Sequence, residues 1–374
     1  MSQQGVVDEV LERIVMTARE EDFDAVVPMS PENLAYASGA APPSQKTVRS
    51  RMAAAVIPAD GTDTEVITVA LEAELVRSQS RLDRVRSYEE FVEHPIDVLA
   101  ACLRDRGLAD ARIGVETGYL PYRDFQRLRA ALPHASLRPA DELWTALREV
   151  KTASEIGRIR EIGQAAQRIT EECLELVSAG STERELANLI SERYHQAGGD
   201  ALTMLVVASG ERSAHLNGPP TGRVLQAGDV VRTDVIGTAS HYHSDLARTA
   251  VVGEPSNEQH RIYKLLVDVH WRCIEALAPG VVSSDIYRLY LEAMEAAKLP
   301  AYHFVGHGLG ITLHEEPFIN SLTSVPLQEG MVLCIEPLTV IPGQFGMQVE
   351  DTVLITADGC EPLTKVGEML RIAA

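Results

Sequence analysis

Three acidic residues interrupt apolar, strand-like segments in the second half of the chain. Asp234 lies in VVRTDVIG, Glu336 in MVLCIEPL and Glu350 in MQVEDTVL. Because an unpaired carboxylate is expensive to bury, a single acid in such a place is ordinarily at a strand end or in a salt bridge. Three of them in one region, with Asp245 and glycine-flanked histidines nearby, have a common explanation if together they bind a cation.

Asp234 and Asp245 stand eleven positions apart. A strand, a turn near Gly237–Ser240 and a returning strand would bring the two carboxylates opposite one another. Two carboxylates that face each other across a strand pair repel unless something positive lies between them. Taken alone, the same pattern also fits an ordinary hairpin with exposed acids.

His307 stands between glycines in GHGLG (306–310), and HEEP (314–317) follows shortly after. The glycines would let the backbone approach a ligand closely and would leave the imidazole unobstructed. They argue against a helix, and the spacing differs from the H-x-x-x-H helix signature of zinc hydrolases. By itself, a glycine-flanked histidine also fits an ordinary loop.

Taken together, these four carboxylates and one imidazole predict a metal site that is rich in oxygen ligands and lacks thiolates, unlike a structural zinc site. Four carboxylates carry too much negative charge for one small divalent cation. Two divalent ions that share carboxylates and a bridging hydroxide would balance the charge. Ions roughly 3.5–4 Å apart can hold both the attacking water and the reacting oxygen, so the pattern indicates hydrolysis.

With these residues in place, the sequence resembles the pita-bread metallopeptidases, a family that includes methionine aminopeptidase, aminopeptidase P, prolidase and creatinase. The resemblance spans roughly residues 155–370, and SPENLAYASG (30–39) more weakly resembles the creatinase-type N-terminal domain. The matching segments are SGERSAHLNGPPT (209–221), TDVIGTASHYHSDLART (233–249), GHGLGITLHEEP (306–317), EGMVLCIEPL (329–338) and FGMQVEDTVLIT (345–356).

The resemblance implies a metal-binding role for each matching residue. Asp234 should chelate one metal ion, while Asp245 and Glu350 should bridge both. His307 and Glu336 should complete the second site. Glu336 should also handle the proton of the bridging water, which the metal ions make a hydroxide near neutral pH and which is the nucleophile. The implied cofactors are two divalent ions, Mn²⁺ first, with Co²⁺, Zn²⁺ and Fe²⁺ as alternatives.

Further histidines match catalytic or substrate-binding positions of the family. His215 and His314 correspond to catalytic histidines that hydrogen-bond the substrate carbonyl as it becomes an oxyanion and that assist the leaving nitrogen. His303, four residues before the glycine-flanked histidine, matches a substrate-contacting position of proline-specific members. His241 replaces a usual glycine and forms an H-x-H pair with His243. We interpret His241 as a rim or substrate contact, because the five-ligand set is already complete.

Gln348 departs from the family pattern. It stands two residues before the last metal ligand, where proline-specific members usually carry Arg, and it is a candidate substrate contact. A neutral amide cannot match the bidentate pairing of a guanidinium with a carboxylate. Either another arginine substitutes for the missing one, or the substrate lacks the usual dipeptide geometry, as in relatives that open cyclic amidines such as ectoine.

All five ligand positions are intact, which argues against creatinase, a metal-free enzyme, and against non-enzymatic members of the family. The leading hypothesis is a metallo-hydrolase of the prolidase or aminopeptidase P type, which cleaves the amide bond of Xaa-Pro dipeptides or of peptides with an N-terminal Xaa-Pro. The alternative is metal-dependent hydrolysis of a small non-peptide cyclic amidine or amide. A binding module without turnover would require degraded ligands.

The surrounding pattern predicts two domains with the α+β fold class overall. Residues 1–150 alternate strand-like runs with helical periods around Ile96–Arg106 and Tyr122–Leu132, which is typical of a small α/β domain. Residues 151–374 should form the pita-bread catalytic domain. There we expect helices near 182–199, 258–277 and 284–298, the first opened by a Thr182-x-x-Glu185 capping box.

Composition argues against several classes of binding partner and indicates the cellular location. The chain has 374 residues, with 34 Lys and Arg against 54 Asp and Glu, and a formal net charge of −20. This acidity argues against nucleic acid and anionic membranes as partners. Five widely spaced cysteines fit reduced thiols, and neither a signal peptide nor a membrane-spanning run is evident. We therefore expect a cytoplasmic protein, and the family resemblance implies a homodimer that acts on a small peptide or amide.

Arg49 and Arg51 lie on a proline-rich loop, AAPPSQKTVRSRMA, of the N-terminal domain. Arginines in such a loop are ordinarily solvated or paired with surface acids. The family resemblance leaves open a role in anchoring a substrate carboxylate, because N-terminal-domain loops of its members reach over the active site.

Overall fold

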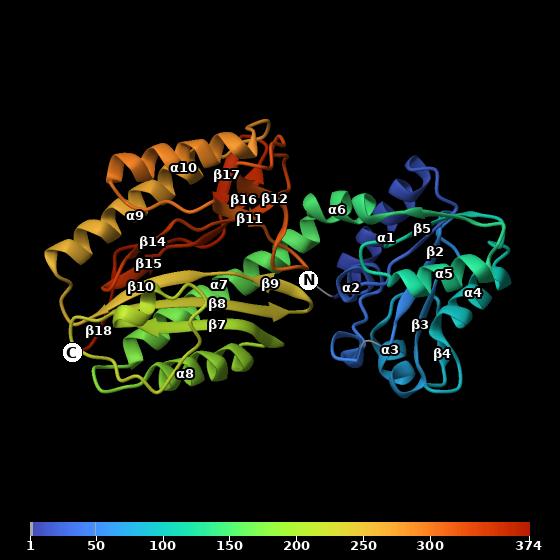
Figure 1. The fold of residues 1–374 in the computed structure, drawn as a ribbon, viewed down its shortest axis with the longest axis horizontal. Coiled ribbons are helices and arrows are strands. Elements are labelled where there is room, and N and C mark those ends of the chain that lie inside the picture. The colour runs from blue at the N-terminus through green and yellow to red at the C-terminus, as the bar shows by residue number, and fades with distance from the viewer. Residues whose placement is uncertain (1–2, 49) are drawn as a thin grey trace. The chain divides into compact units, whose positions relative to one another are not determined.

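The computed structural model describes residues 3–48 and 50–374, with the side chains of residues 3–8 excepted, so Arg49 lies outside the described residues. The chain divides into two compact units, Met1–Arg148 and Glu149–Ala374 (Figure 1). In the described part of the chain, no helix combines the length and the hydrophobicity that a membrane crossing requires.

The first unit is built on a six-stranded mixed sheet in the order β4-β3-β2-β1-β5-β6. The pairs β3/β4, β1/β5 and β5/β6 are parallel, whereas β2 runs antiparallel to both of its neighbours. The strands are β1 (Ala25–Val27), β2 (Ala54–Pro58), β3 (Glu65–Val69), β4 (Arg84–Tyr88), β5 (Arg112–Val115) and β6 (Ser136–Pro139). The helices are α1 (Gln3–Glu20), α2 (Pro31–Ser38), α3 (Ala73–Gln79), α4 (Pro95–Asp105), α5 (Tyr122–Ala131) and α6 (Asp141–Glu149), with short 3-10 turns η1 (Pro43–Lys46) and η2 (Ala70–Glu72).

The core of this unit forms because apolar residues recur with the period of each element. On α4, Ile96, Leu99 and Leu103 are fully buried at helical spacing, and they pack with the buried strands β2 and β3. Each such aliphatic side chain contributes about 1.5–3 kcal/mol when it is removed from water. The predicted helices around 96–106 and 122–132 and the α/β character are confirmed. Arg51 pairs with Glu90 at 2.8 Å, as expected for a loop arginine.

The second unit contains two five-stranded sheets and a two-stranded hairpin. Its helices are α7 (Ala153–Leu176), α8 (Glu183–Gln196), α9 (Asn257–Glu275) and α10 (Ser283–Ala297), with the 3-10 turn η3 (Gly210–Ala214). Its strands are β7 (Ala201–Ser209), β8 (Val230–Ala239), β9 (Tyr242–Ser244), β10 (Ala247–Val252), β11 (Phe304–Gly308), β12 (Glu315–Asn320), β13 (Val332–Ile335), β14 (Leu338–Ile341), β15 (Phe345–Gln348), β16 (Asp351–Thr356), β17 (Gly359–Pro362) and β18 (Leu370–Ile372).

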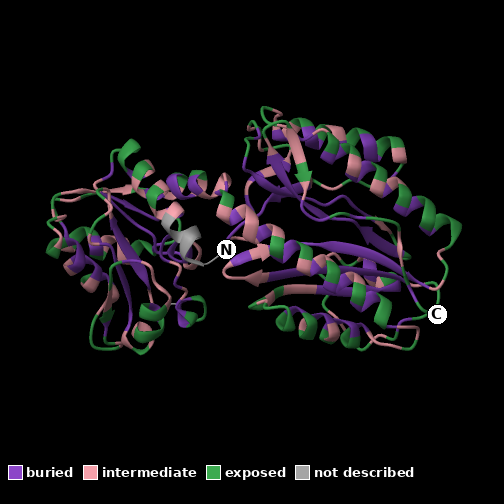
Figure 2. Ribbon diagram, turned by 180° about the vertical axis from the view of Figure 1, so that it is seen from behind, coloured by how far each residue is buried: buried purple, intermediate pink, exposed green. Residues whose placement is uncertain are grey.

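The two sheets of this unit each carry a pair of helices. The sheet β18-β10-β8-β7 packs against α7 and α8, and the sheet β12-β11-β13-β16-β17 packs against α9 and α10 (Figure 1). Figure 2 shows that the strands are largely buried, whereas the helices expose one face to solvent. The pairing is antiparallel except between β10 and β18, which run parallel. The α+β fold class is confirmed.

Helix starts in this unit follow the sequence signals. Thr182 accepts a hydrogen bond from the backbone of Glu185, whose carboxylate accepts one from the backbone of Thr182, so the predicted capping box is confirmed. Thr152 opens α7 and Ser256 opens α9 in the same way. Each box satisfies two backbone donors that the helix itself leaves unpaired.

Candidate metal centre

The first two acids of the predicted site come from the first sheet. Asp234 is in the middle of β8, and the chain turns at Ser240 and His241, both with positive φ, before it returns through β9 and β10. Asp234 is in register with Ala247, so Asp245 lies in the break between β9 and β10 rather than directly opposite Asp234. The predicted hairpin is confirmed, with its turn at the end of the expected range.

His307 lies on β11, and its flanking glycines face neighbouring backbone. A Cβ on Gly306 would lie 2.2 Å from the carbonyl oxygen of Cys334, and one on Gly308 would lie 2.4 Å from that of Glu316. Both glycines are therefore required for β13 and β12 to approach β11. The prediction that this segment is not helical is confirmed, but the glycines serve strand packing as well as access to the imidazole.

The remaining acids flank two neighbouring strands of the second sheet. Glu336 directly follows β13 and Glu350 directly precedes β16, and these strands are antiparallel, with Ile335 in register with Asp351. Each glutamate is therefore one position beyond the same cross-strand pair, which places both carboxylates at one end of the sheet.

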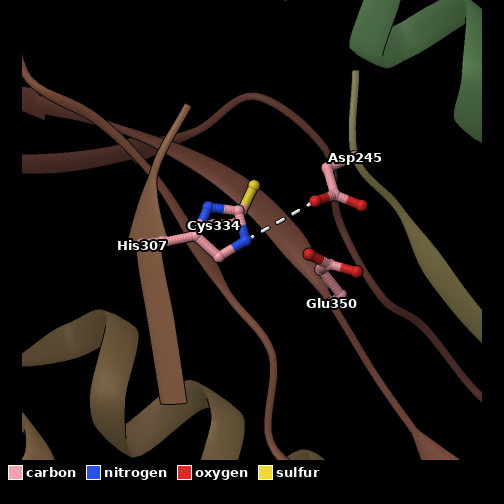
Figure 3. A group of neighbouring side chains, drawn as sticks. All are labelled: Asp245, His307, Cys334 and Glu350. Carbon is pink, nitrogen blue, oxygen red and sulfur yellow. Dashed lines mark ion pairs between the residues drawn. The ribbon is translucent and has the colours of Figure 1, made fainter. Parts of the chain in front are cut away.

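The structure brings these groups together in the interior of the second unit. The Nε2 atom of His307 is 3.5 Å from Oδ2 of Asp245 and 3.2 Å from Oε1 of Glu336. Ligand atoms of Asp245, His307, Cys334 and Glu350 all lie within 4.8 Å of one another (Figure 3). Every one of these side chains is buried.

Several carboxylate oxygens of the cluster have no hydrogen-bond partner among the described residues. They are Oδ1 of Asp234 and both Oε1 and Oε2 of Glu350, all of them buried. Buried polar atoms are almost always satisfied, so three orphaned acceptors in one cluster point to an electrophile that the protein itself does not supply. The donor set fits a divalent cation with a preference for oxygen and imidazole ligands.

The electrostatics of the cluster support this fit. Burial raises the pKa of Asp234 to about 6, against the opposing charge of Arg232. Burial, followed by repulsion from Asp234 and Glu336, raises the pKa of Asp245 well above its ordinary value. Burial and repulsion from Asp245 do the same to the pKa of Glu350. These carboxylates cannot all ionise without added positive charge nearby, and divalent ions provide it.

His307 is held in the tautomer that a metal ligand requires. Its Nδ1 lies 3.0 Å from the carbonyl oxygen of Gly308. A carbonyl only accepts hydrogen bonds, so Nδ1 carries the proton and Nε2 presents a lone pair to the cluster. This backbone contact orients the ring in the way that supporting groups orient metal-bound histidines.

Cys334 belongs to the same group of neighbours but differs in charge. Burial, followed by repulsion from Asp245 and Glu350, raises the pKa of its thiol well above the ordinary value. The thiol therefore stays protonated, whereas a metal ligand or a nucleophile needs the thiolate. Cys334 is thus a small buried residue of β13 rather than a ligand or a nucleophile.

The other predicted histidines lie on loops of the second unit. The ring centroid of His314 is 3.9 Å from that of His307. His314 is exposed by surface area, but loss of hydration at the crowded ring, followed by the influence of His307, lowers its pKa to about 4. His215 follows η3 and is exposed, His303 is exposed in the loop before β11, and His241 forms the turn between β8 and β9.

Comparison with known proteins decides the family. Residues 157–357, more than half of the chain, match the model of metallopeptidase family M24. The chain belongs to this family. Residues 11–150 match the creatinase/prolidase N-terminal domain, and the resemblance to pita-bread metallopeptidases is thereby confirmed. As a member of family M24, the chain is a metallo-hydrolase that takes divalent metal ions.

Relatives of this M24 chain match it along nearly its full length. It is 30% identical to a Xaa-Pro dipeptidase of Pyrococcus furiosus over 96% of this chain and 98% of the relative. The structure of an X-Pro aminopeptidase from Thermotoga maritima has a TM-score of 0.86 at 26% identity, covering 97% of this chain and 99% of the other. The structure of dipeptidase PepE from Mycobacterium ulcerans has a TM-score of 0.84 at 27% identity and covers both chains completely.

One buried residue of the M24 centre is missed by the sequence analysis. Arg232 lies beside Gln348, and its Nη1 donates to Oε1 of Gln348 at 2.6 Å. The signal is present in the sequence: Arg232 interrupts the same apolar strand as Asp234, two positions earlier and therefore on the same face. A guanidinium therefore lies beside the Gln348 amide, but its hydrogen bonds are to the protein itself.

Proposed function

We propose that this chain is a dinuclear-metal hydrolase of the amide bond in Xaa-Pro dipeptides, or in peptides with an N-terminal Xaa-Pro. The relatives above support this assignment, because they are named for Xaa-Pro dipeptidase, X-Pro aminopeptidase and dipeptidase activities. These names do not favour the alternative substrate, a small cyclic amidine or amide.

The observation that carries the proposal is the set of buried carboxylate oxygens that lack hydrogen-bond partners among the described residues. Asp234 would bind one ion, Asp245 and Glu350 would bind both, and His307 and Glu336 would complete the second site. We propose Mn²⁺ as the native metal, with Co²⁺, Zn²⁺ and Fe²⁺ as alternatives. When bound, a pair of divalent ions supplies an acidified water and Lewis-acid polarisation of the carbonyl.

Glu336 would accept the proton of the attacking water, and its surroundings support this role. Its Oε1 faces Nε2 of His307 at 3.2 Å, and its Oε2 accepts a hydrogen bond from Nε2 of Gln348 at 3.3 Å. The Gln348 amide thus orients the carboxylate next to the ligand cluster, while its other oxygen and the lone pair of His307 Nε2 face each other as two ligands of one ion would. A general base in this position can take the proton as the water attacks and return it to the departing nitrogen.

The loop histidines would act on the substrate. His314 is neutral at physiological pH, because its pKa is about 4. It therefore offers one N–H to the developing oxyanion and one lone pair, without adding positive charge to a centre that already binds cations. His215 would contact the same substrate from the loop after η3, with His303 and His241 as rim contacts.

A substrate panel tests the proposal. Purified protein is stripped with a chelator, reloaded with Mn²⁺, and assayed on Xaa-Pro dipeptides, longer peptides with Xaa-Pro at the N-terminus, matched Xaa-Ala peptides and ectoine-like cyclic amidines. We expect hydrolysis of Xaa-Pro substrates, lost with the metal and restored by Mn²⁺. Inert Xaa-Pro substrates would overturn the specificity, and activity that survives exhaustive metal removal would overturn the mechanism.

A further inference from the structure

Arg232 is a buried cation directly beside the metal centre. Its side chain is 2% exposed, and its Nη1 is 4.0 Å from Oδ2 of Asp234. Burying a guanidinium is costly unless its donors are satisfied, so its hydrogen bonds indicate what this residue does.

Two of its three nitrogens hold the loop that carries His215. The Nε atom donates to the carbonyl oxygen of Ser213 at 3.1 Å, and Nη2 donates to that of His215 at 2.7 Å and also to that of Leu216. This loop lies close to β15, because a Cβ on Gly346 would approach the Ser213 carbonyl to 2.5 Å. The guanidinium therefore ties the His215 loop to β8.

The third nitrogen determines how the amide of Gln348 is oriented. Arginine only donates hydrogen bonds, so the Gln348 atom that faces Nη1 at 2.6 Å must be the oxygen. The amide NH₂ then points the other way, and it donates to Oε2 of Glu336 at 3.3 Å. The backbone of Gln348 is fixed as well, since its N–H and C=O both bond the hydroxyl of Thr249.

Four of the five N–H groups of Arg232 have protein acceptors within hydrogen-bond distance, and the second N–H of Nη1 has Oδ2 of Asp234 4.0 Å from its nitrogen. No pair of free donors is left for the bidentate pairing of arginine with a substrate carboxylate. Arg232 is therefore not placed to anchor a substrate directly, although it neighbours a position predicted to contact substrate.

We propose that Arg232 is a positioning residue that acts through Gln348: it holds the amide so that the NH₂ group orients Glu336, and it fixes the His215 loop beside it. Without the guanidinium, the Gln348 amide can flip and present its oxygen to the Glu336 carboxylate, which repels it. This inference rests on the proposed metal centre, in which Glu336 is a ligand.

The test measures metal binding, so that it does not depend on the substrate. Supporting groups around metal ligands are worth about 10–100-fold in affinity. We expect Gln348→Met to weaken one of the two Mn²⁺ binding steps by about tenfold in titration calorimetry, with little change in thermal unfolding of the metal-free protein. Arg232→Met should weaken the same step by a similar factor, and the double variant should be no weaker than the single ones.

A matched control is Arg106→Met, which removes another buried arginine, 3% exposed, from the first unit. We expect it to lower stability and to leave both Mn²⁺ steps unchanged. Additive losses in the double variant, or unchanged Mn²⁺ binding in Gln348→Met, would overturn the proposal. If the unaltered protein bound fewer than two Mn²⁺ ions, the proposed metal centre itself would fail, and this result is distinct from the other two.

A kinetic readout separates positioning from general loosening of the fold. If the unaltered protein hydrolyses Xaa-Pro substrates, Gln348→Met should lower kcat by about tenfold with KM within a factor of three, because Glu336 acts on water rather than on substrate binding. A rise in KM at constant kcat would instead make Gln348 a substrate contact and would contradict the positioning role.

Discussion

A buried ion-pair network behind the metal centre should contribute several kcal/mol to the stability of the second unit. Asp351, fully buried, accepts four hydrogen bonds: from Arg248 and Thr364 at 2.9 Å on Oδ1, and from His270 at 2.9 Å and the Val366 amide at 2.8 Å on Oδ2. The perturbation is Asp351→Asn, which keeps the shape, removes the charge, and replaces one acceptor oxygen by a donor.

The expected loss of stability in Asp351→Asn has two contributions, one from the lost charge and one from the lost hydrogen-bond acceptor. Burial acts against the charged form, but Arg248 and His270 outweigh it and lower the pKa of Asp351 from 3.8 to about 2, which corresponds to roughly 2 kcal/mol at neutral pH. In Asn, the NH₂ group must also face two donors, and a buried group left unpaired costs about 1–3 kcal/mol. We therefore expect a loss of about 4 kcal/mol, within the range of about 3–5 kcal/mol for breaking a buried ion pair.

The assay must report on the second unit alone, because two units can unfold separately. The chain has two tryptophans, Trp144 in the first unit and Trp271 in the second. In a Trp144→Phe background, urea unfolding followed by Trp271 fluorescence in the presence of a chelator isolates the network, since the Trp271 ring centroid is 5.6 Å from that of His270.

The control is Asp285→Asn, which removes an exposed pair with Arg288 on α10 and should change the free energy of unfolding by less than about 0.5 kcal/mol. If Asp351→Asn cost less than about 1 kcal/mol in the same background, the reasoning would be refuted. Its four hydrogen bonds would then contribute no more than an exposed pair.

Further predictions concern catalysis, packing and pH. Glu336→Gln should lower kcat by at least about 100-fold with substrate still bound, and near-normal kcat would exclude its role as a base. Gly308→Ala should cost about 2–3 kcal/mol because its Cβ would meet a carbonyl of β12 at 2.4 Å, whereas Gly367→Ala, which meets nothing within 4 Å, is the control. Hydrogen bonds from Arg112 lower the pKa of Asp24 from 3.8 to about 2. The stability that the Asp24 carboxylate gives to the first unit is therefore present above about pH 4 and is lost as the pH falls toward 2. Above pH 4, the Asp24→Asn variant should have a free energy of unfolding lower than that of the unaltered protein by at most about 1 kcal/mol, because solvent screens this pair. Unfolding measured at decreasing pH should show this difference vanish between pH 4 and pH 2. A difference that stays constant with pH would contradict the prediction.

Much of the fold could be predicted because local signals agreed with the tertiary structure. Apolar residues at helical spacing identified α4, α5, α9 and α10 to within a few residues, and the Thr182 capping box identified the start of α8. Four of the predicted metal ligands, Asp245, His307, Glu336 and Glu350, also lie close together where strands of the two sheets meet. Charged groups in apolar strands were the informative feature, because such positions are costly unless a ligand or partner compensates them.

The parallel pairing of β18 with β10 could not be predicted, because it joins segments more than one hundred residues apart and no local pattern encodes it. The displacement of Asp245 from the position opposite Asp234 is similar, since it depends on the break between β9 and β10. The close contacts at Gly306 and Gly308 could not be predicted either, because they depend on which strands become neighbours.

The sequence by itself determined which residue types could form the metal centre, since acids and a histidine within apolar strands are chemically conspicuous wherever the chain runs. Only the tertiary structure decided what surrounds them. Arg232 and Gln348 are 116 positions apart, and their contact follows from β8 and β15 being brought together around the His215 loop. Hydrogen-bond direction then imposes one amide orientation, and that constraint exists in space but not along the chain.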